Sequence, residues 1–282
     1  MLIIWTDEKI TEMMLLKNLK LALVQMRSIL GDLHANLEKM MAFVDRAAEE
    51  KTDIICFPEM SLTGYSSEYG PEDVISDDDP VVETVRNAAC KKDIAVIFGF
   101  MEKNGEDLPY LTQLIACPDG TYVKYRKTHL GTREEGCFTC GGSIPVIRTK
   151  NAIIGVALCW EAHIPDIFSV LRRNGAELIF IPHASNLGGE RRKETWMRYL
   201  PARAWDNDVY VAACNSIGDN GRGSVSGGGT IVMNRKGIAI FENFNGTESL
   251  DIVELEGFDR DDGLSYDMCN IKYFQRRRPE LY

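Results

Sequence analysis

Short apolar runs bounded by breakers recur along this chain and alternate with segments of helical pattern. Runs of this kind are typical of buried strands. Their alternation with helices favours an α/β protein, and the turn residues at Pro118–Gly120 and Asn234–Gly237 predict antiparallel hairpins. The predicted helices include Asn36–Glu50, Val81–Cys90, Ile164–Asn174 and Glu190–Asn207; the predicted strands include Leu21–Met26, Ile54–Phe57, Ile94–Phe98, Leu111–Cys117, Leu178–Ile181, Val209–Ala213, Thr230–Met233 and Ile238–Phe241.

A length of 282 residues would by itself suggest about two domains. The chain contains no Pro/Ser-rich linker, charge block or internal repeat that would divide it, so we expect one large domain from residue 19 to 282. Residues 1–18 form a predicted N-terminal extension. The acidic residues Asp7, Glu8 and Glu12 interrupt it, and it lacks the positive start and apolar core of a secretory signal. We therefore expect a cytoplasmic protein.

The charge and composition of the chain indicate which classes of binding partner it is unsuited to. The chain has 32 Lys+Arg against 42 Asp+Glu, a formal charge of −10, which disfavours nucleic acid and anionic membranes. No apolar stretch approaches the ~20 residues that span a bilayer. Eight cysteines without a signal peptide favour a reducing compartment over a disulfide framework. We expect neither nucleic acid nor membrane as a partner.

Three chemically useful side chains stand just past predicted strands. Glu59 follows Asp53–Phe57, Lys127 follows Tyr122–Tyr125, and Cys159 follows Ile153–Leu158. In sheets with crossover connections, ligands bind outside the carboxyl ends of the strands. The sequence therefore predicts that a carboxylate, an ammonium and a thiol meet at one rim of a sheet.

Together these groups suit acyl transfer. A thiol is a good nucleophile as thiolate, which a positive charge or a helix N-terminus favours. Lys127 could supply the charge, and the helix Ile164–Asn174 begins soon after Cys159, which places the thiol at a strand-to-helix elbow. Glu59 could accept the thiol proton and later donate it to a leaving amine, provided that burial raises its pKa.

Each residue also has an ordinary structural interpretation. Buried free cysteines are usually inert, Lys127 lies in a mixed run typical of a solvated strand end, and Glu59 after Pro58 could cap a turn. Taken singly, these interpretations are the better ones. The common placement of all three residues after strands favours the active site.

The surrounding motifs resemble the carbon–nitrogen hydrolase, or nitrilase, superfamily from about residue 19 onward. No single motif would suffice, but their order along the chain is that of the family. The matching stretches are Leu21–Gln25 with Gly31-Asp32 and Asn36; Phe57-Pro58-Glu59 with Thr63-Gly64-Tyr65; Tyr125-Arg126-Lys127-Thr128-His129-Leu130; Gly155–Cys159 with Trp160-Glu161 and Pro165; Arg203-Ala204-Trp205-Asp206-Asn207; and Arg277-Arg278-Pro279-Glu280-Leu281-Tyr282.

This resemblance implies an αββα sandwich that forms a homodimer or a higher homo-oligomer. It implies that Glu59 is the general base and acid, Lys127 the oxyanion-stabilising residue and Cys159 the nucleophile, with no metal or organic cofactor. A second glutamate would help to position substrate or water. Counting back seven positions from Gly142 favours Glu135 over Glu134 in this role. The backbone N–H of Trp160 would be the second oxyanion donor.

Several further residues have weaker predictions. His183 follows the strand Leu178–Ile181 and is expected to line the pocket, whereas Trp196 and Arg203 are expected to be packing and ion-pair residues rather than substrate contacts. The segment Gly221–Gly229 is expected to be a mobile loop. Cys137 and Cys140 lie near His129, but a structural zinc site needs four ligands and the chain has no second pair at similar spacing.

Three functional classes remain open. The first is a hydrolase of non-peptide C–N bonds, the second a papain-type Cys–His enzyme with His129, His163 or His183 as base, and the third a non-catalytic scaffold. The intact trio favours the first class. Within it, a small amide or an N-carbamoyl compound is favoured over a nitrile, because Ala162 stands where the nitrilase branch usually has Asn, and Thr128–Thr132 lacks that branch's Pro-Thr.

Overall fold

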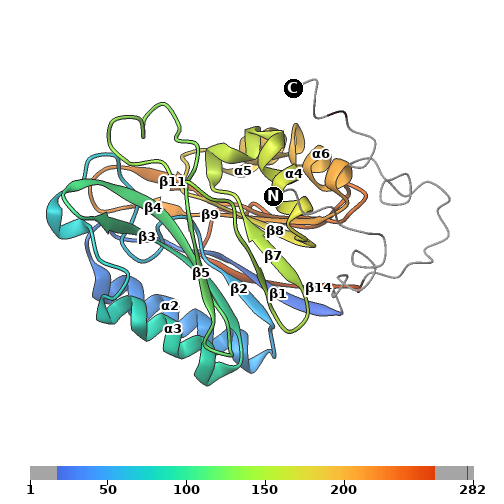
Figure 1. Ribbon diagram of the computed structural model, residues 1–282, viewed down its shortest axis with the longest axis horizontal. Helices are drawn as coiled ribbons and strands as arrows, with labels where there is room; N and C mark the ends of the chain where they lie inside the picture. Colours follow the sequence, from blue (N-terminus) through green and yellow to red (C-terminus); the bar gives the residue numbers. More distant parts are fainter. Residues whose placement is uncertain (1–17, 258–277, 279–282) are drawn as a thin grey trace.

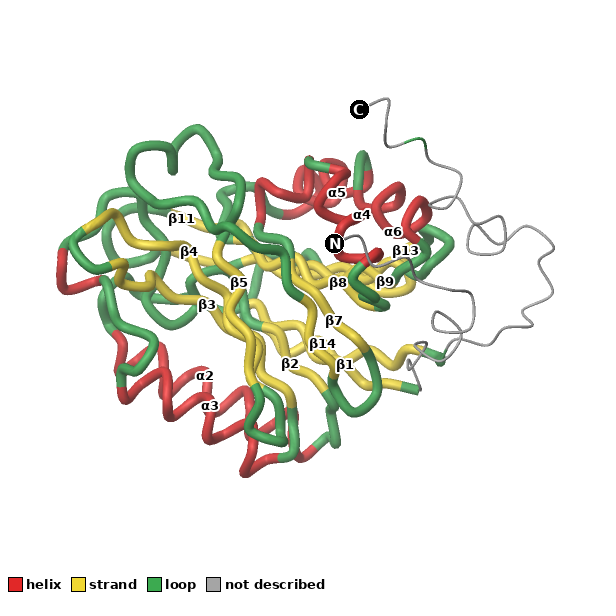
Figure 2. Tube along the Cα trace, viewed as in Figure 1, coloured by secondary structure: helices red, strands yellow, loops and turns green. Residues whose placement is uncertain are grey.

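Two six-stranded sheets pack face to face, and helices cover their outer faces (Figure 1; Figure 2). This computed structural model describes residues 18–257 and 278. The predicted extension lies outside the described residues except for Asn18, and the C-terminal motif lies outside them except for Arg278. The αββα architecture that the resemblance implied is therefore confirmed.

The first sheet mixes parallel and antiparallel strands. Strands β1, β2 and β3 run parallel to one another, β3, β4 and β5 form an antiparallel meander, and β14 pairs antiparallel with β1. The predicted hairpin at Pro118–Gly120 joins β4 to β5. In sheet order the strands are β14 (Ser249–Leu255), β1 (Leu19–Gln25), β2 (Ile54–Cys56), β3 (Ala95–Asn104), β4 (Asp107–Ala116) and β5 (Tyr122–Arg126).

The second sheet repeats this plan. Strands β7, β8 and β9 are parallel, with β6 antiparallel on one side and the predicted β12–β13 hairpin on the other. In sheet order the strands are β13 (Ala239–Asn243), β12 (Thr230–Met233), β9 (Tyr210–Asn215), β8 (Leu178–His183), β7 (Ile153–Val156) and β6 (Val146–Arg148).

The glycine-rich segment Gly221–Gly229 is more regular than the sequence suggested. Its residues Val225–Gly227 form strand β11, which pairs with β10 (Ile217–Asp219), and Gly227 also bridges to Gly188. A Cβ on Gly188 would lie 2.3 Å from the carbonyl oxygen of Gly227. The glycines here allow two backbone segments to approach closely. A glycine-rich composition is the same for such a close approach and for a mobile loop, so the sequence did not distinguish them.

The helices divide between the sheets. Helices α2 (Leu33–Glu49) and α3 (Pro80–Lys92) cover the first sheet, while α4 (Pro165–Arg173), α5 (Gly189–Met197) and α6 (Leu200–Asn207) cover the second (Figure 1). The 3₁₀ helices η1 (Pro71–Asp73) and η2 (Cys159–His163) lie in loops. None of the described helices is long and apolar enough to cross a membrane.

The prediction of a single helix over Glu190–Asn207 is wrong. The chain forms two helices there, α5 and α6, with a break at Arg198 and Tyr199. Pro201 lies in the first turn of α6. Proline has no N–H and clashes with the preceding turn, so it starts a helix readily and interrupts one that is already under way. The apolar periodicity continues across the break, which is why the pattern predicted one helix.

Three apolar layers hold the sandwich together. Leu21, Leu23, Ile154, Val156 and Phe180 belong to the layer between the two sheets, and each is at most 1% exposed. The other two layers lie between each sheet and its helices. Burial of apolar surface on this scale fixes the sheets against each other, and with them the positions of the strand ends.

Candidate active site

Four strands deliver their following residues to one rim of the sandwich. β2 leads to Glu59 and β5 to Lys127 in the first sheet, while β7 leads to Cys159 and β8 to Ala184 in the second. Lys127 contacts Glu59 on the side of the first sheet, and the hydrogen bond from the Ala184 amide to Glu59 crosses from the second sheet to the first. The convergence that the sequence predicted for Glu59 and Lys127 is thus present, and Cys159 interacts electrostatically with both.

Lys127 is fully buried between two carboxylates. Its Nζ lies 2.8 Å from Glu59 Oε1 and 2.7 Å from Glu134 Oε1. Burial alone would lower the pKa of the ammonium, but the two carboxylates outweigh this and raise it well above its usual range. Lys127 therefore stays protonated and presents a fixed positive charge.

Glu59 has the environment of a proton carrier. Burial raises its pKa to about 7, with Lys127 opposing and Glu134 adding to the rise. Its Oε2 accepts a hydrogen bond of 3.2 Å from the Ala184 amide, which holds the carboxylate in place. A carboxyl group with this pKa exchanges a proton readily near neutrality, as general acid–base chemistry requires.

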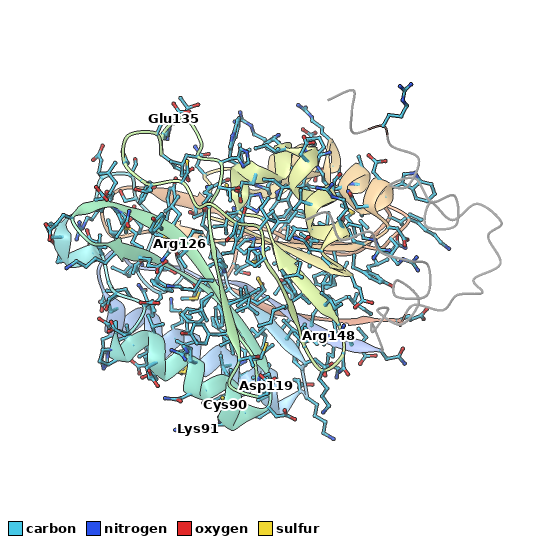
Figure 3. The ribbon with its side chains drawn as sticks, in the orientation of Figure 1. Cys90, Lys91, Asp119, Arg126, Glu135 and Arg148 are labelled. Carbon is cyan, nitrogen blue, oxygen red and sulfur yellow. The ribbon has the colours of Figure 1, made fainter. Side chains whose placement is uncertain are left out.

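The second glutamate in this cluster is Glu134, whereas the sequence favoured Glu135. Besides Lys127, Glu134 accepts from the Tyr65 hydroxyl at 2.9 Å and from the Gly131 amide at 2.6 Å. Glu135 is exposed and points outward from its loop (Figure 3). The chain makes a helical turn here, so neighbouring side chains diverge, and counting positions from Gly142 misses by one residue.

Cys159 occupies the predicted strand-to-helix elbow. Its φ of 43° is in the left-handed region, which is costly for a residue with a Cβ and is often found at functional sites. The residue begins η2, three residues past β7, and α4 follows at Pro165. It retains partial exposure. The fold therefore holds Cys159 in a strained backbone conformation, with the residue as a whole partly exposed.

The thiol is protonated at rest. Burial and the Glu59 carboxylate raise the pKa of Cys159 to about 12, and the Lys127 ammonium lowers it only in part. Lys127 therefore does favour the thiolate, as the sequence predicted. Burial and the Glu59 carboxylate favour the protonated thiol more strongly. Attack by Cys159 needs a base, and Glu59 is the carboxyl group poised to accept a proton near neutrality.

Glu161 ties the elbow to the segment that carries Lys127. Its Oε2 accepts from the Leu158 amide at 2.7 Å, and its Oε1 accepts from the Thr128 amide at 2.8 Å and the His129 amide at 3.1 Å. The Tyr125 hydroxyl donates to it as well, at 2.7 Å. The sequence placed Glu161 in a family motif without giving it a role. Its full burial and its hydrogen bonds to Leu158 and Thr128 indicate a structural one.

Trp196 packs as expected, whereas Arg203 binds backbone carbonyls and forms no ion pair among the residues that the structure describes. Trp196 is fully buried. Arg203 donates from Nε to the carbonyl oxygen of Ala162 at 3.0 Å and from Nη2 to that of His163 at 3.1 Å. Because both carbonyls belong to η2, α6 holds the far end of the elbow.

His183 is buried, and its pocket-lining role stays a prediction. Its Nδ1 lies 2.8 Å from the Ile181 carbonyl oxygen, and its Nε2 accepts from Trp196 Nε1 at 3.2 Å. Burial lowers the pKa of this imidazole well below its usual value. Both ring nitrogens are engaged inside the protein, so the neutral ring supports the strand end from which Ala184 reaches Glu59.

The remaining histidines and cysteines form no competing site in the described part of the chain. Within the described residues, Cys159 makes no hydrogen bond with a histidine, as a papain-type pair would need. Cys137 and Cys140 are free thiols, and His129 is largely exposed. Across residues 18–257 and 278, no three His, Cys, Asp or Glu side chains are grouped to hold a metal ion.

Comparison with known proteins places this geometry in a family. The sequence model described as "Carbon-nitrogen hydrolase" matches residues 20–257. A probable nitrilase of Schizosaccharomyces pombe is 28% identical over 93% of this chain and 96% of its own length, and an (R)-stereoselective amidase of Pseudomonas sp. is 26% identical over 79% and 80%.

The fold comparison agrees with the sequence comparison. The crystal structure of an amidase from Nesterenkonia sp. superimposes with a TM-score of 0.77 at 26% identity, covering 94% of this chain and 95% of that one. The family match extends over most of the chain and includes every residue of the buried cluster described above. The chain therefore belongs to the carbon–nitrogen hydrolase family and is an enzyme that hydrolyses C–N bonds.

Proposed function

We propose that this enzyme hydrolyses small linear amides or N-carbamoyl compounds through a thioester on Cys159. The observation that carries the proposal is the Lys127 ammonium, held within 2.8 Å of two buried carboxylates beside the strained thiol. Such a group is already oriented before substrate arrives. Fixed charges directed at the position where an oxyanion develops are among the strongest sources of catalysis.

Acylation uses Glu59 first as base and then as acid. Glu59 accepts the Cys159 proton as sulfur attacks the carbonyl carbon, and the π electrons of the carbonyl move onto oxygen. Lys127 Nζ and the Trp160 amide stabilise that oxyanion. When the intermediate collapses, the C–N bond breaks, Glu59 donates its proton to the departing nitrogen, and an acyl thioester remains on Cys159.

Deacylation repeats these steps with water. Glu59, again a carboxylate, takes a proton from water as the hydroxyl oxygen attacks the thioester carbonyl, and then returns the proton to the departing sulfur. Glu134 fixes Lys127 from the side opposite Glu59 and helps to position substrate and water, the role that the sequence had given to Glu135. The products are the acid and ammonia, and for an N-carbamoyl substrate the carbamic acid then loses CO₂.

The relatives support the amide assignment and leave a nitrile as the second candidate. The names of the Pseudomonas and Nesterenkonia proteins give amidase activity, whereas the S. pombe protein is named a probable nitrilase. The Cys159-Trp160-Glu161 sequence also favours the nitrilase branch, although Ala162 does not. Cytoplasmic location and homo-oligomer formation remain predictions.

The decisive experiment measures ammonia release and the protein mass together. Purified enzyme is screened with aliphatic amides, N-carbamoyl compounds and nitriles, and intact mass is recorded during turnover. We expect ammonia release from amides or carbamoyl compounds, an acyl adduct that maps to Cys159, and no turnover by Cys159→Ala. Folded wild-type enzyme that releases ammonia only from nitriles would assign the second candidate, and full activity with Cys159 alkylated would refute the thioester.

A further inference from the structure

Asn215 is a fully buried asparagine at the end of β9, beside the loop that follows β8. Strands β8 and β9 run parallel, and the last residues that they pair are His183 and Asn215. A buried carboxamide is costly unless its polar atoms are hydrogen-bonded. The contacts of Asn215 therefore indicate which part of the structure it holds.

The side chain of Asn215 clamps the backbone of Ser185. Its Oδ1 accepts from the Ser185 amide at 2.9 Å, and its Nδ2 donates to the Ser185 carbonyl oxygen at 3.0 Å. A carboxamide offers a donor and an acceptor, as a peptide group does, so this side chain extends the β8–β9 ladder by one residue. Its Nδ2 also donates to the carbonyl oxygens of Leu187 at 3.2 Å and Gly228 at 3.0 Å. Both polar atoms thus hold backbone.

Ser185 directly follows Ala184, whose amide reaches Glu59 from the second sheet. That amide donates to Glu59 Oε2 at 3.2 Å. On one side of Ala184, the carbonyl oxygen of His183 accepts a backbone hydrogen bond of 3.0 Å. On the other side, Ser185 is held by Asn215. The Ala184 side chain is only a methyl group, so its flanking residues fix the direction of its amide.

The Ala184 amide supports the ionised form of Glu59, because a hydrogen bond donated to a carboxylate favours its charge. It is the donor to Oε2, while Lys127 donates to Oε1 at 2.8 Å. Burial raises the pKa of Glu59 to about 7. Loss of the Ala184 donor would raise this pKa further, and less of the base would be ionised at neutral pH.

The charged and titratable groups around Glu59 are separate from Asn215. Those that influence Glu59 electrostatically are Lys127, Glu134, Glu161, Cys159 and Tyr65. Among the described residues, Asn215 is hydrogen-bonded to none of them. His183, its strand partner, stays neutral because burial lowers its pKa well below the usual value. A substitution at Asn215 therefore reaches Glu59 through the backbone, without adding or removing a charge.

We propose that Asn215 is a positioning residue, which holds the Ala184 amide against Glu59. It does so through Ser185 and takes no part in bond making or breaking. This inference rests on the proposed function, in which Glu59 accepts the proton of Cys159. Loss of Asn215 should change the pH range in which the enzyme works more than it changes the highest rate.

The test measures the pH dependence of two rates in wild type and Asn215→Ala. One is kcat/KM for the best amide or carbamoyl substrate, and the other is alkylation of Cys159 by iodoacetamide, which needs no substrate. In wild type, both should fall as the pH drops through about 7. In the variant, the inflection should move up by about 1 pH unit, because a hydrogen bond to a charged group changes proton affinity by about this much. Well below the inflection this shift is about a 10-fold loss, whereas at high pH most of the rate should remain.

Replacing Ala184 by lactic acid tests the amide directly, since the resulting ester has an oxygen in place of the N–H. This change should shift the inflection as Asn215→Ala does. Both changes together should shift it little further than the ester alone, because they act on one hydrogen bond. Asn215→Ser keeps one polar atom and is the second variant if Asn215→Ala does not fold.

The matched control is Asn36→Ala. Asn36 is 2% exposed and clamps Ile29 in the same way, accepting from its amide at 2.8 Å and donating to its carbonyl oxygen at 2.7 Å. Thermal unfolding shows which variants are folded. We expect Asn36→Ala to lower thermal stability but to leave the inflection at the wild-type pH, because Asn36 does not hold the Ala184 loop.

Two sets of outcomes separate this proposal from the proposed function. A folded Asn215 variant with the wild-type inflection, or an equal shift in Asn36→Ala, would overturn the Asn215 proposal alone. Wild-type enzyme without an inflection near 7 in either profile, or without hydrolysis of any amide or carbamoyl compound, would instead overturn the proposed function.

Discussion

We predict that Glu161→Gln weakens the hydrogen bonds that hold the backbone around Cys159 in place. The substitution changes none of the groups that the proposed mechanism uses. The carboxylate accepts on one oxygen from the Leu158 amide and on the other from the Thr128 and His129 amides. A glutamine side chain has only one acceptor oxygen, so in either orientation its NH₂ faces at least one backbone N–H. The less costly orientation leaves the Leu158 donor unsatisfied.

The size of the effect follows from these contacts. One buried donor without a partner costs about 1–3 kcal/mol, and the hydrogen bonds that remain weaken because their acceptor has lost its charge. We expect the free energy of unfolding to fall by about 2–3 kcal/mol. For a domain of this size, each kcal/mol lowers Tm by roughly 2–4 °C, so Tm should fall by about 4–12 °C.

The activity loss should exceed what unfolding explains. Leu158 directly precedes Cys159, so releasing its amide lets the strained elbow relax away from Glu59. We expect kcat to fall about 10-fold at a temperature where the variant is fully folded, because small misplacements of a reacting group are costly. Glu161→Ala, which removes every acceptor, should cost about 4–5 kcal/mol.

Denaturant unfolding monitored by circular dichroism and steady-state ammonia release measure the two effects. Glu135→Gln is the matched control, because it makes the same chemical change on an exposed loop. If Glu161→Gln stayed within about 0.5 kcal/mol of wild type and kept its kcat, the elbow would not depend on this carboxylate and the reasoning would be refuted.

Three further predictions concern the cluster itself. Lys127→Arg should lose at least ~100-fold in kcat although the charge is kept, because a planar fork cannot replace a compact ammonium between Glu59 and Glu134; a near-normal rate would make Lys127 structural. Glu134→Gln should accumulate acyl enzyme in intact-mass spectra while Glu135→Gln turns over normally; the reverse result would restore the assignment made from the sequence. Cys159 alkylation by iodoacetamide should accelerate as pH rises through about 7, since Glu59 accepts the thiol proton only when it is ionised, and Glu59→Gln should abolish that inflection; an unchanged profile would exclude Glu59 as the base.

Much of the fold was accessible from sequence because buried strands leave a local signature. The runs ending before Glu59 and Cys159 are strands whose residues face apolar layers on both sides, so their composition reports their position. The run before Lys127 is the edge strand β5, which has a mixed composition and only one buried residue. Strand β14 was not predicted. It alternates half-buried with buried residues at the sheet edge, and its partner β1 lies more than 200 residues earlier in the chain.

The parts of the site that sequence missed depend on orientation and distant contacts. Glu134 and Glu135 are identical in composition and adjacent, and only the turn around Gly131 decides which of them faces Lys127. The contact of Asn215 with Ser185 arises because β9 lies beside β8, which sheet pairing decides and local sequence does not. An asparagine after an apolar run ordinarily indicates a turn, so no local pattern predicts this contact.

The proposed catalytic residues are divided between the two sheets, so the proposed mechanism makes enzyme activity a measure of folding. Glu59 and Lys127 come from the first sheet, and Cys159 and the Ala184 amide come from the second, so neither half holds a working set of groups. A refolding intermediate with both sheets formed but not yet docked would regain its far-ultraviolet signal while remaining inactive. The return of turnover therefore times the docking step, and substitutions at the sheet–sheet interface will alter that lag even though they lie far from the substrate.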